Sequence, residues 1–225
     1  MSETRFAEGH FTRGRAPRGT RLVLIRHGEA RCNAEGVVGG PLGDGGLTEL
    51  GRAQARALAT RLSATGELAD ASALYTSVLG RSIETADLLA VGLPGLSATA
   101  DCDLCELHPG DADALTWTQM RERYGLPDWD TNPDVAFSPG GESWLDFYER
   151  CQRVVATLVA RHPGERVVCV VHGGVIEQVM KEITRDEPAA RLGLRTEHCS
   201  MSEIEFDGTG RRLLRYNDVA PLSLA

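Results

Sequence analysis

The 225-residue sequence has no apolar run approaching the ~20 residues that a membrane-spanning helix needs. Residues 1–21 also lack the apolar middle of a secretory signal, so we expect a soluble, cytoplasmic protein that binds no membrane. Positive charge is not in excess, because 24 Lys and Arg against 32 Asp and Glu give a formal net charge of −8. This balance argues against nucleic-acid binding, so any arginines that bind an anion must act locally.

Cysteine is too sparse for a disulfide scaffold. The six cysteines are scattered along the chain, and we expect reduced thiols. Cys102 and Cys105 have the two-residue spacing of metal ligands, but the sequence has no second such pair and structural zinc usually needs four ligands. We interpret this spacing as coincidence and predict no metal site.

The chain divides by composition at residue 21. Residues 1–20 hold arginines among Gly, Pro and Thr without apolar periodicity, which predicts a flexible N-terminal tail. A small basic arm that binds a partner is the alternative interpretation. The abrupt apolar run at residues 22–25 begins a single globular domain over 21–225.

Strand and helix patterns alternate through this domain. Apolar runs at residues 22–25, 73–75 and 167–171 predict strands, and helical spacing follows Thr48, starts again at Leu79, covers 144–158 and resumes after Gly174. Continuously apolar strands that alternate with helices predict an α/β fold with three layers, α/β/α, around a mainly parallel central sheet.

Two histidines follow the predicted strands. His27 comes after the first strand and His172 after the last long one. A lone histidine in such a place is more often a turn or core residue than a catalyst. Because the carboxyl ends of parallel strands form the binding crevice of an open α/β sheet, the pair favours a catalytic site.

The residues around these histidines resemble a known family. Residues 24–29, Leu-Ile-Arg-His-Gly-Glu, followed by Asn33, are similar to the signature of the histidine phosphatase superfamily (branch 1), the phosphoglycerate mutase-like enzymes. Further blocks arrive in the family's order at residues 47–51, 76–86, 104–110, 141–143 and 171–174. The resemblance covers roughly residues 22–180 and implies the phosphoglycerate mutase-like fold.

Phosphoryl transfer needs a nucleophile, positive charge on the phosphate oxygens and a proton for the leaving oxygen. We predict that neutral His27 attacks phosphorus and carries the phosphoryl group as a covalent phosphohistidine. Arg26 and Arg81 offer planar sets of donors that match phosphate oxygens. The resemblance implies that His172, next to Gly173, donates a hydrogen bond to phosphate.

Glu106 is the candidate general acid, and an exposed loop carboxylate is its alternative interpretation. Asn33 either donates its amide to phosphate or forms a turn. The predicted catalytic residues are Arg26, His27, Arg81, Glu106 and His172. The predicted phosphate-binding residues are Arg26, Asn33, Arg81, His172 and Gly173. The mechanism requires no metal or organic cofactor.

Some positions depart from the family pattern. Ala30 stands where the family usually has a hydroxyl residue, and Val78, Gly80 and Ser82 alter the start of the helix that carries the second arginine. His108 is either a substrate contact or a surface loop residue. Trp117 and Trp129 are either core residues or substrate contacts. The glycines within residues 39–46 either close over the leaving group or turn the chain.

The sequence predicts a phosphomonoester hydrolase that acts on a small phosphorylated metabolite. The alternatives are a cofactor-dependent phosphoglycerate mutase-type phosphotransferase and a catalytically inactive binding module. Only 35 residues separate Glu106 from Glu142, whereas family mutases resemble one another in having a longer insertion there. All five predicted catalytic residues are present, which disfavours the binding module. The identity of the substrate and a homodimer are left open.

Overall fold

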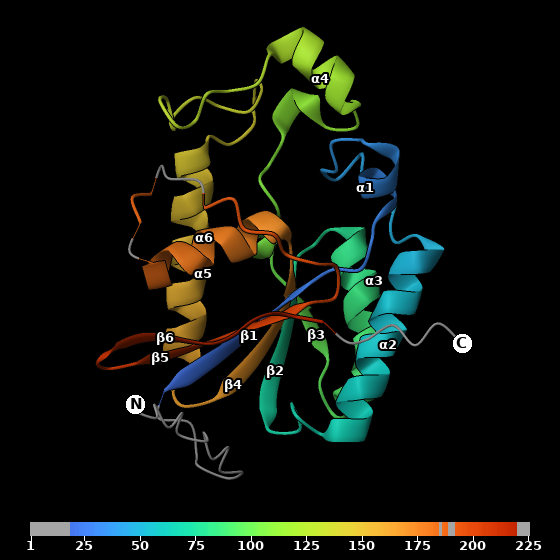
Figure 1. The fold of residues 1–225 in the computed structure, drawn as a ribbon, viewed down its shortest axis with the longest axis vertical. Helices are drawn as coiled ribbons and strands as arrows, with labels where there is room; N and C mark the ends of the chain where they lie inside the picture. Colours follow the sequence, from blue (N-terminus) through green and yellow to red (C-terminus); the bar gives the residue numbers. More distant parts are fainter. Residues whose placement is uncertain (1–18, 185, 189–191, 220–225) are drawn as a thin grey trace, which may run out of the picture.

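The computed structural model describes residues 19–184, 186–188 and 192–219, and within them a six-stranded sheet lies between helices (Figure 1). The strand order is β3-β2-β4-β1-β5-β6. β1 (Thr20–Arg26), β2 (Ala71–Thr76), β3 (Ala98–Ala100) and β4 (Arg166–Val171) are parallel to one another. The predicted α/β class and the three layers are confirmed.

The predicted tail falls almost wholly outside the described residues. Its last residue, Thr20, is the first residue of β1 and is buried. The Thr20 hydroxyl donates to the His162 carbonyl at 2.7 Å and accepts from the Gly164 amide at 3.1 Å. The first strand therefore begins one residue before the predicted domain boundary.

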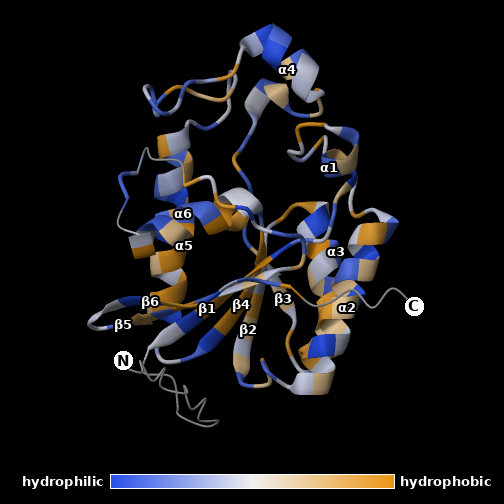
Figure 2. Ribbon diagram, in the orientation of Figure 1, coloured by the Kyte–Doolittle hydropathy of each residue, from blue (hydrophilic) through white to orange (hydrophobic). Residues whose placement is uncertain are grey.

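Alternating side chains of the central strands bury both faces of the sheet. Val23, Ile25, Val168 and Val170 pack with α2 (Glu49–Thr65) and α3 (Gly80–Leu89). The intervening residues of β1 and β4 pack on the other face with α5 (Trp144–Arg161) and α6 (Gly173–Thr184). Figure 2 shows the apolar residues concentrated where helices meet the sheet. None of the helices in the described part of the chain is long and apolar enough to cross a membrane.

Local signals set the ends of the principal helices. The Thr48 hydroxyl caps α2 by accepting from the Gly51 amide at 3.0 Å, and the helix ends at Gly66 in the left-handed region, at a φ of 62°. Ser143 caps α5 by accepting from the Asp146 amide at 3.1 Å. α3 begins at Gly80 despite the altered residues around it.

The last two strands correct the predicted strand–helix alternation. β5 (Met201–Asp207) runs antiparallel to β1, and β6 (Gly210–Asp218) completes a hairpin at the edge of the sheet. The sheet is therefore mixed. β5 carries the buried carboxylates of Glu203 and Glu205, so its sequence does not read as an apolar strand.

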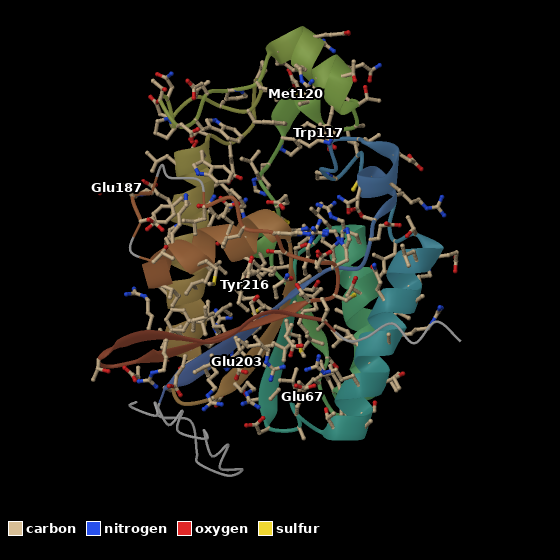
Figure 3. All side chains as sticks on the ribbon, viewed as in Figure 1. Glu67, Trp117, Met120, Glu187, Glu203 and Tyr216 are labelled. Carbon is tan, nitrogen blue, oxygen red and sulfur yellow. The ribbon has the colours of Figure 1, made fainter. Side chains whose placement is uncertain are left out.

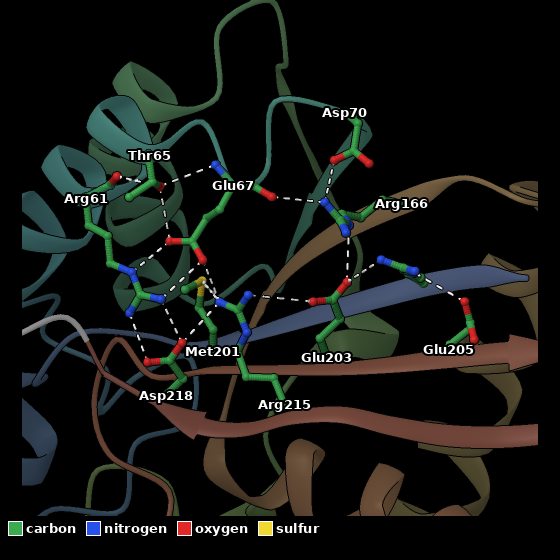
Figure 4. A network of polar contacts seen from close by, with 11 residues as sticks. Arg61, Thr65, Glu67, Asp70, Arg166, Met201, Glu203, Glu205, Arg215 and Asp218 are labelled. Atoms are coloured by element: carbon green, nitrogen blue, oxygen red, sulfur yellow. Dashed lines mark hydrogen bonds and ion pairs between the residues drawn. The ribbon is translucent and has the colours of Figure 1, made fainter. Parts of the chain in front are cut away.

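Ion pairs balance the charge of these carboxylates at the end of the sheet where β1 and β4 begin. Figure 4 shows Glu203 near Arg166, with an N···O distance of 3.2 Å, and Arg215 bonded to Glu67 at 2.7 Å. Arg61 joins the same network through Glu67 and Asp218. The network attaches the hairpin of β5 and β6 to the end of α2. Charge pairs between distant segments therefore hold in place two strands that apolar periodicity did not predict.

A cap of loops and short helices lies over the opposite end of the sheet, with Trp117 and Met120 in it (Figure 3). It contains α4 (Trp117–Tyr124) and a small core of its own around Met120 and Phe137. The other short elements are α1 (Arg31–Glu35) and the 3-10 helices η1 (Ala90–Gly92), η2 (Cys102–Leu104) and η3 (Gly110–Ala112). The cap leaves a pocket between itself and the carboxyl ends of the strands.

Candidate active site

A pocket of about 580 Å³ opens between the cap and the ends of β1 and β4. Arg26, His27, Arg81 and Glu106 line it, and His172 lies fully buried beside them with its ring centroid 5.0 Å from that of His27. The structure therefore brings all five predicted catalytic residues to one place, although they span about two thirds of the sequence. Parallel strands that end at the same edge bring the two histidines together.

His27 is held as a neutral imidazole whose Nε2 carries a lone pair and no proton. Its Nδ1–H donates to the Gly28 carbonyl at 2.7 Å, which leaves Nε2 unprotonated. Arg81 Nε donates to this Nε2 at 3.2 Å. Burial, followed by the charges of Arg81 and Arg26, holds the pKa of His27 well below its usual range. Nε2 is therefore available as a nucleophile at neutral pH.

Asp44 fixes the position of Arg81. One carboxylate oxygen accepts from the Arg81 backbone amide at 2.9 Å, and the other forms an ion pair with Nη1. Nη1 also donates to the Gly39 carbonyl at 2.8 Å. A Cβ at Gly80 would lie 2.6 Å from Oδ2 of Asp44, so glycine at this position gives the carboxylate room to reach the start of α3.

Arg26 presents an unsatisfied donor beside the nucleophile. Its Nη1 donates to the Thr196 carbonyl, but its buried Nε has no hydrogen-bond partner among the described residues. A Cβ at Gly173 would lie 3.6 Å from this Nε, so Gly173 leaves the guanidinium uncovered. Burial lowers the pKa of Arg26, although the Glu106 carboxylate opposes this.

His172 likewise presents a buried donor that has no partner among the described residues. Its Nε2 lies 2.8 Å from the Ser77 hydroxyl and 3.3 Å from that of Ser82. When these hydroxyls donate, the proton of the neutral ring sits on Nδ1, which is buried without a partner among the described residues. Burial and the charge of Arg81 hold the pKa of His172 well below its usual range.

Glu106 is clamped to the amino end of α6. Its two carboxylate oxygens accept from the Leu107 amide at 3.1 Å and the Gly174 amide at 3.0 Å. A Cβ at Gly174 would collide with this carboxylate, so the second glycine of the motif is needed for the contact. Arg150 braces the loop by donating to the Glu106 and Cys105 carbonyls at 3.2 and 2.9 Å.

Asn33 lines the pocket, and its side-chain oxygen accepts from the Ala30 amide at 3.2 Å at the start of α1. The structure thus shows the turn-forming role, and the phosphate contact stays a prediction. His108 does not line the pocket. Its amide and its ring instead lie against Glu142, the ring Nδ1 at 3.5 Å from Oε1.

Sequence reasoning missed several residues of the site. The sequence marks Asp44 only as the acidic residue of the glycine-rich loop. The role of Arg150 depends on chain segments that only the fold brings together. His198 also went unnoticed; its Nδ1 donates to the His27 carbonyl at 3.1 Å. Ser77 and Ser82 stand within the recognised arginine block, and a buried histidine needs such partners, so their role could have been found.

The part of the pocket farther from the histidines is apolar and aromatic. Trp129 stacks on Trp144 with ring centroids 5.2 Å apart, and Trp117 meets Phe137 edge to face at 5.9 Å. Trp117 is 44% exposed at the rim. The indoles of Trp117 and Trp129 therefore both pack in the cap and face the pocket.

The sequence model of the histidine phosphatase superfamily (branch 1) matches residues 22–219. This chain belongs to that superfamily. Phosphoglycerate mutase-like protein 4 of Arabidopsis thaliana is 34% identical over 205 residues, which are 89% of this chain and 86% of the relative. The metal-independent phosphoserine phosphatase of the same plant is 33% identical over 178 residues, 77% of this chain and 72% of the relative.

The solved structures give the same assignment. Mycobacterial glucosyl-3-phosphoglycerate phosphatase has a TM-score of 0.73 and 30% identity to this chain, and the match covers 88% of this chain and 99% of that one. The fold of this superfamily member is therefore phosphoglycerate mutase-like, as the sequence resemblance implied.

Proposed function

We propose that this protein hydrolyses phosphomonoesters of small metabolites through a phosphohistidine on His27. One observation carries the proposal: the unprotonated Nε2 of His27 lies among buried donors, and two of these, Arg26 Nε and His172 Nδ1, have no partner among the described residues. Buried donors without acceptors are costly in a folded protein. A phosphate group supplies the missing acceptors.

In the first step His27 Nε2 attacks phosphorus, and the bond from phosphorus to the ester oxygen breaks. Arg26, Arg81 and His172 hold the phosphate oxygens, and Arg81 exchanges its bond to His27 for one to phosphate. Protonated Glu106 gives its proton to the leaving alcohol. In the second step the Glu106 carboxylate takes a proton from water, which attacks phosphorus and releases phosphate and neutral His27.

The lining of the pocket defines the organic part of the substrate. Among the described lining residues, the guanidinium groups are those of Arg26 and Arg81, and both lie at the phosphate end. The remainder includes the rings of Trp117, Trp129 and Phe137 together with the carboxylate of Glu177. We propose a substrate with one phosphate and an uncharged, largely apolar body that stacks on these rings.

The position of both guanidinium groups at the phosphate end also distinguishes hydrolysis from mutase chemistry. Bisphosphoglycerate-dependent mutases are also similar to this chain. A bisphosphorylated carboxylic acid would need cations at both ends of the pocket, because buried anionic groups require charged or hydrogen-bonding partners. No cationic side chain lines the described aromatic end, and this supports hydrolysis over the mutase alternative.

The test is hydrolysis of an aryl phosphate in EDTA by the wild type and by His27→Ala. We expect metal-independent turnover that falls at least about a thousand-fold in the variant. Naphthyl phosphate should give a higher kcat/KM than phosphoserine or 3-phosphoglycerate. Turnover that survives in His27→Ala would overturn the mechanism, and a preference for 3-phosphoglycerate would overturn the substrate class. The cytoplasmic location stays a prediction from the sequence, and a homodimer stays open.

A further inference from the structure

Three metal-binding side chains meet just outside the pocket. Cys102 lies in η2 with its Sγ 3.8 Å from Sγ of Cys105, and the same Cys102 Sγ lies 3.7 Å from Nε2 of His108. The three ligand atoms all lie within 4.8 Å of one another. The two-residue cysteine spacing, interpreted above as coincidence, gains a third ligand because the chain after Glu106 turns back toward η2.

The separations match the edges of a metal tetrahedron. Zinc bonded to thiolate sulfur at about 2.3 Å and to imidazole nitrogen at about 2.0–2.1 Å places tetrahedral ligands about 3.8 Å apart for two sulfurs and about 3.6 Å for sulfur and nitrogen. The observed 3.8 and 3.7 Å agree with these edges. Only small movements are needed for all three atoms to contact one ion.

The surroundings orient the ligands as metal sites require. The second ring nitrogen of His108, Nδ1, lies 3.5 Å from Oε1 of Glu142, and the His108 amide donates to Oε2 of the same carboxylate at 2.8 Å. Arg150 fixes that carboxylate with bonds of 2.6 and 2.7 Å. A carboxylate behind a histidine directs the lone pair of the other nitrogen toward the metal.

The sulfurs of Cys102 and Cys105 differ in exposure, and each suits a different part of metal binding. The Val78 amide donates to the buried sulfur of Cys105 and holds this sulfur in place. Cys102 is exposed and gives a metal ion a way in from solvent. Two thiolates also neutralise a divalent cation without help from the catalytic residues.

We propose that Cys102, Cys105 and His108 bind one Zn²⁺ ion, with water in the fourth position. Binding forms two Zn–S bonds and one Zn–N bond and releases two thiol protons to solvent. None of the three side chains lines the catalytic pocket as described, so the ion lies outside the catalytic site. It ties η2 to the loop beyond Glu106 and thereby restrains the candidate acid from both sides.

The test is titration of the intact, phosphine-reduced protein with Co²⁺ after its six thiols have been counted. We expect one Co²⁺ per chain, sulfur-to-cobalt charge-transfer absorption, strong tetrahedral visible bands, and displacement by Zn²⁺. Cys102→Ser and Cys105→Ser should each abolish or halve the charge-transfer band. His108→Ala should weaken binding at least about 10-fold.

Cys199→Ala is the matched control, because it removes a buried cysteine outside the cluster of Cys102, Cys105 and His108 and should leave the titration unchanged. His27→Ala should also bind Co²⁺ normally, so failure of the metal site and failure of the phosphatase proposal are distinguishable. Circular dichroism verifies that each variant is folded. Absence of stoichiometric Co²⁺ uptake by the reduced wild type, or a thiolate band of undiminished intensity in folded Cys102→Ser, would overturn the proposal.

Discussion

Arg81 Nε donates a hydrogen bond across 3.2 Å to His27 Nε2, the atom that we propose attacks phosphorus. The same guanidinium therefore orients the nucleophile before the substrate arrives and is placed to bind phosphate afterwards. Asp44 holds Arg81 from behind through both its backbone amide and Nη1. His27, Arg81 and Asp44 thus form one chain of contacts. A substitution of Asp44 should therefore lower the rate of attack on phosphorus.

Asp44→Asn tests this chain of contacts. We expect kcat/KM for an aryl phosphate to fall about 10- to 100-fold, because misplacing a reacting group by about an ångström costs up to about 100-fold. Asp87→Asn removes the same charge from an exposed position on α3 and serves as the control. Equal kinetics in the two variants would show that Asp44 does not position Arg81.

Ser77→Ala tests the orientation of His172. The hydroxyl lies 2.8 Å from His172 Nε2, and a hydrogen bond of this kind is worth about 1–1.5 kcal/mol, so kcat/KM should fall about 10-fold. Ser82→Ala, at 3.3 Å, should cost less. In a His172→Ala background the Ser77 change should have no further effect. Additive losses would mean that Ser77 acts independently of the histidine.

Trp117→Ala tests the aromatic end of the pocket. Loss of the half-exposed indole should lower kcat/KM for naphthyl phosphate about 10-fold and should lower that for phenyl phosphate less, because only the larger ring reaches the rim. Val91→Ala removes a more exposed apolar side chain outside the pocket and should change neither value. A uniform loss on both substrates would contradict the proposed stacking.

The buried histidines should make folding stability depend on pH. The pKa values of His27 and His172 lie well below the ordinary 6.5, so the unfolded chain takes up protons that the folded chain refuses. Their contribution is complete above pH 6.5 and is lost as pH falls below it, by up to about 1.4 kcal/mol per pH unit for each ring.

Urea unfolding between pH 7.5 and 5 in phosphate-free buffer measures this loss. His27→Asn should show a shallower fall than the wild type, because one of the titrating rings is gone. The same slope in both proteins would mean that His27 is protonated alike in the folded and unfolded states.

The sequence could predict the parts of the fold that short-range patterns encode. The apolar runs that became β1 and β4, the Thr48 cap and the parallel arrangement all follow from local periodicity. Because parallel strands end at one edge, the meeting of His27 and His172 also followed. The convergence of Arg81 and Glu106 rested on the resemblance, since Arg81 follows a shorter strand signal and no strand was predicted before Glu106.

The features that the sequence did not predict depend on contacts between distant segments of the chain. β5 escaped prediction because Glu203 and Glu205 interrupt its apolar pattern, and their partners come from β1, β4 and β6. Asp44 lies 37 residues from Arg81 in the sequence, and no spacing rule joins them. His108 reaches Cys102 only because Glu142 and Arg150 fold its loop back.

The most direct test of the account is to trap the covalent intermediate. The wild type is mixed with a ³²P-labelled phosphomonoester and quenched within one turnover, and the label on the chain is tested for stability in acid and base. We predict an acid-labile, base-stable phosphoryl group on His27 that is absent from His27→Asn. Turnover by the wild type without any label on His27, or a label of the same kind on His27→Asn, would contradict the account.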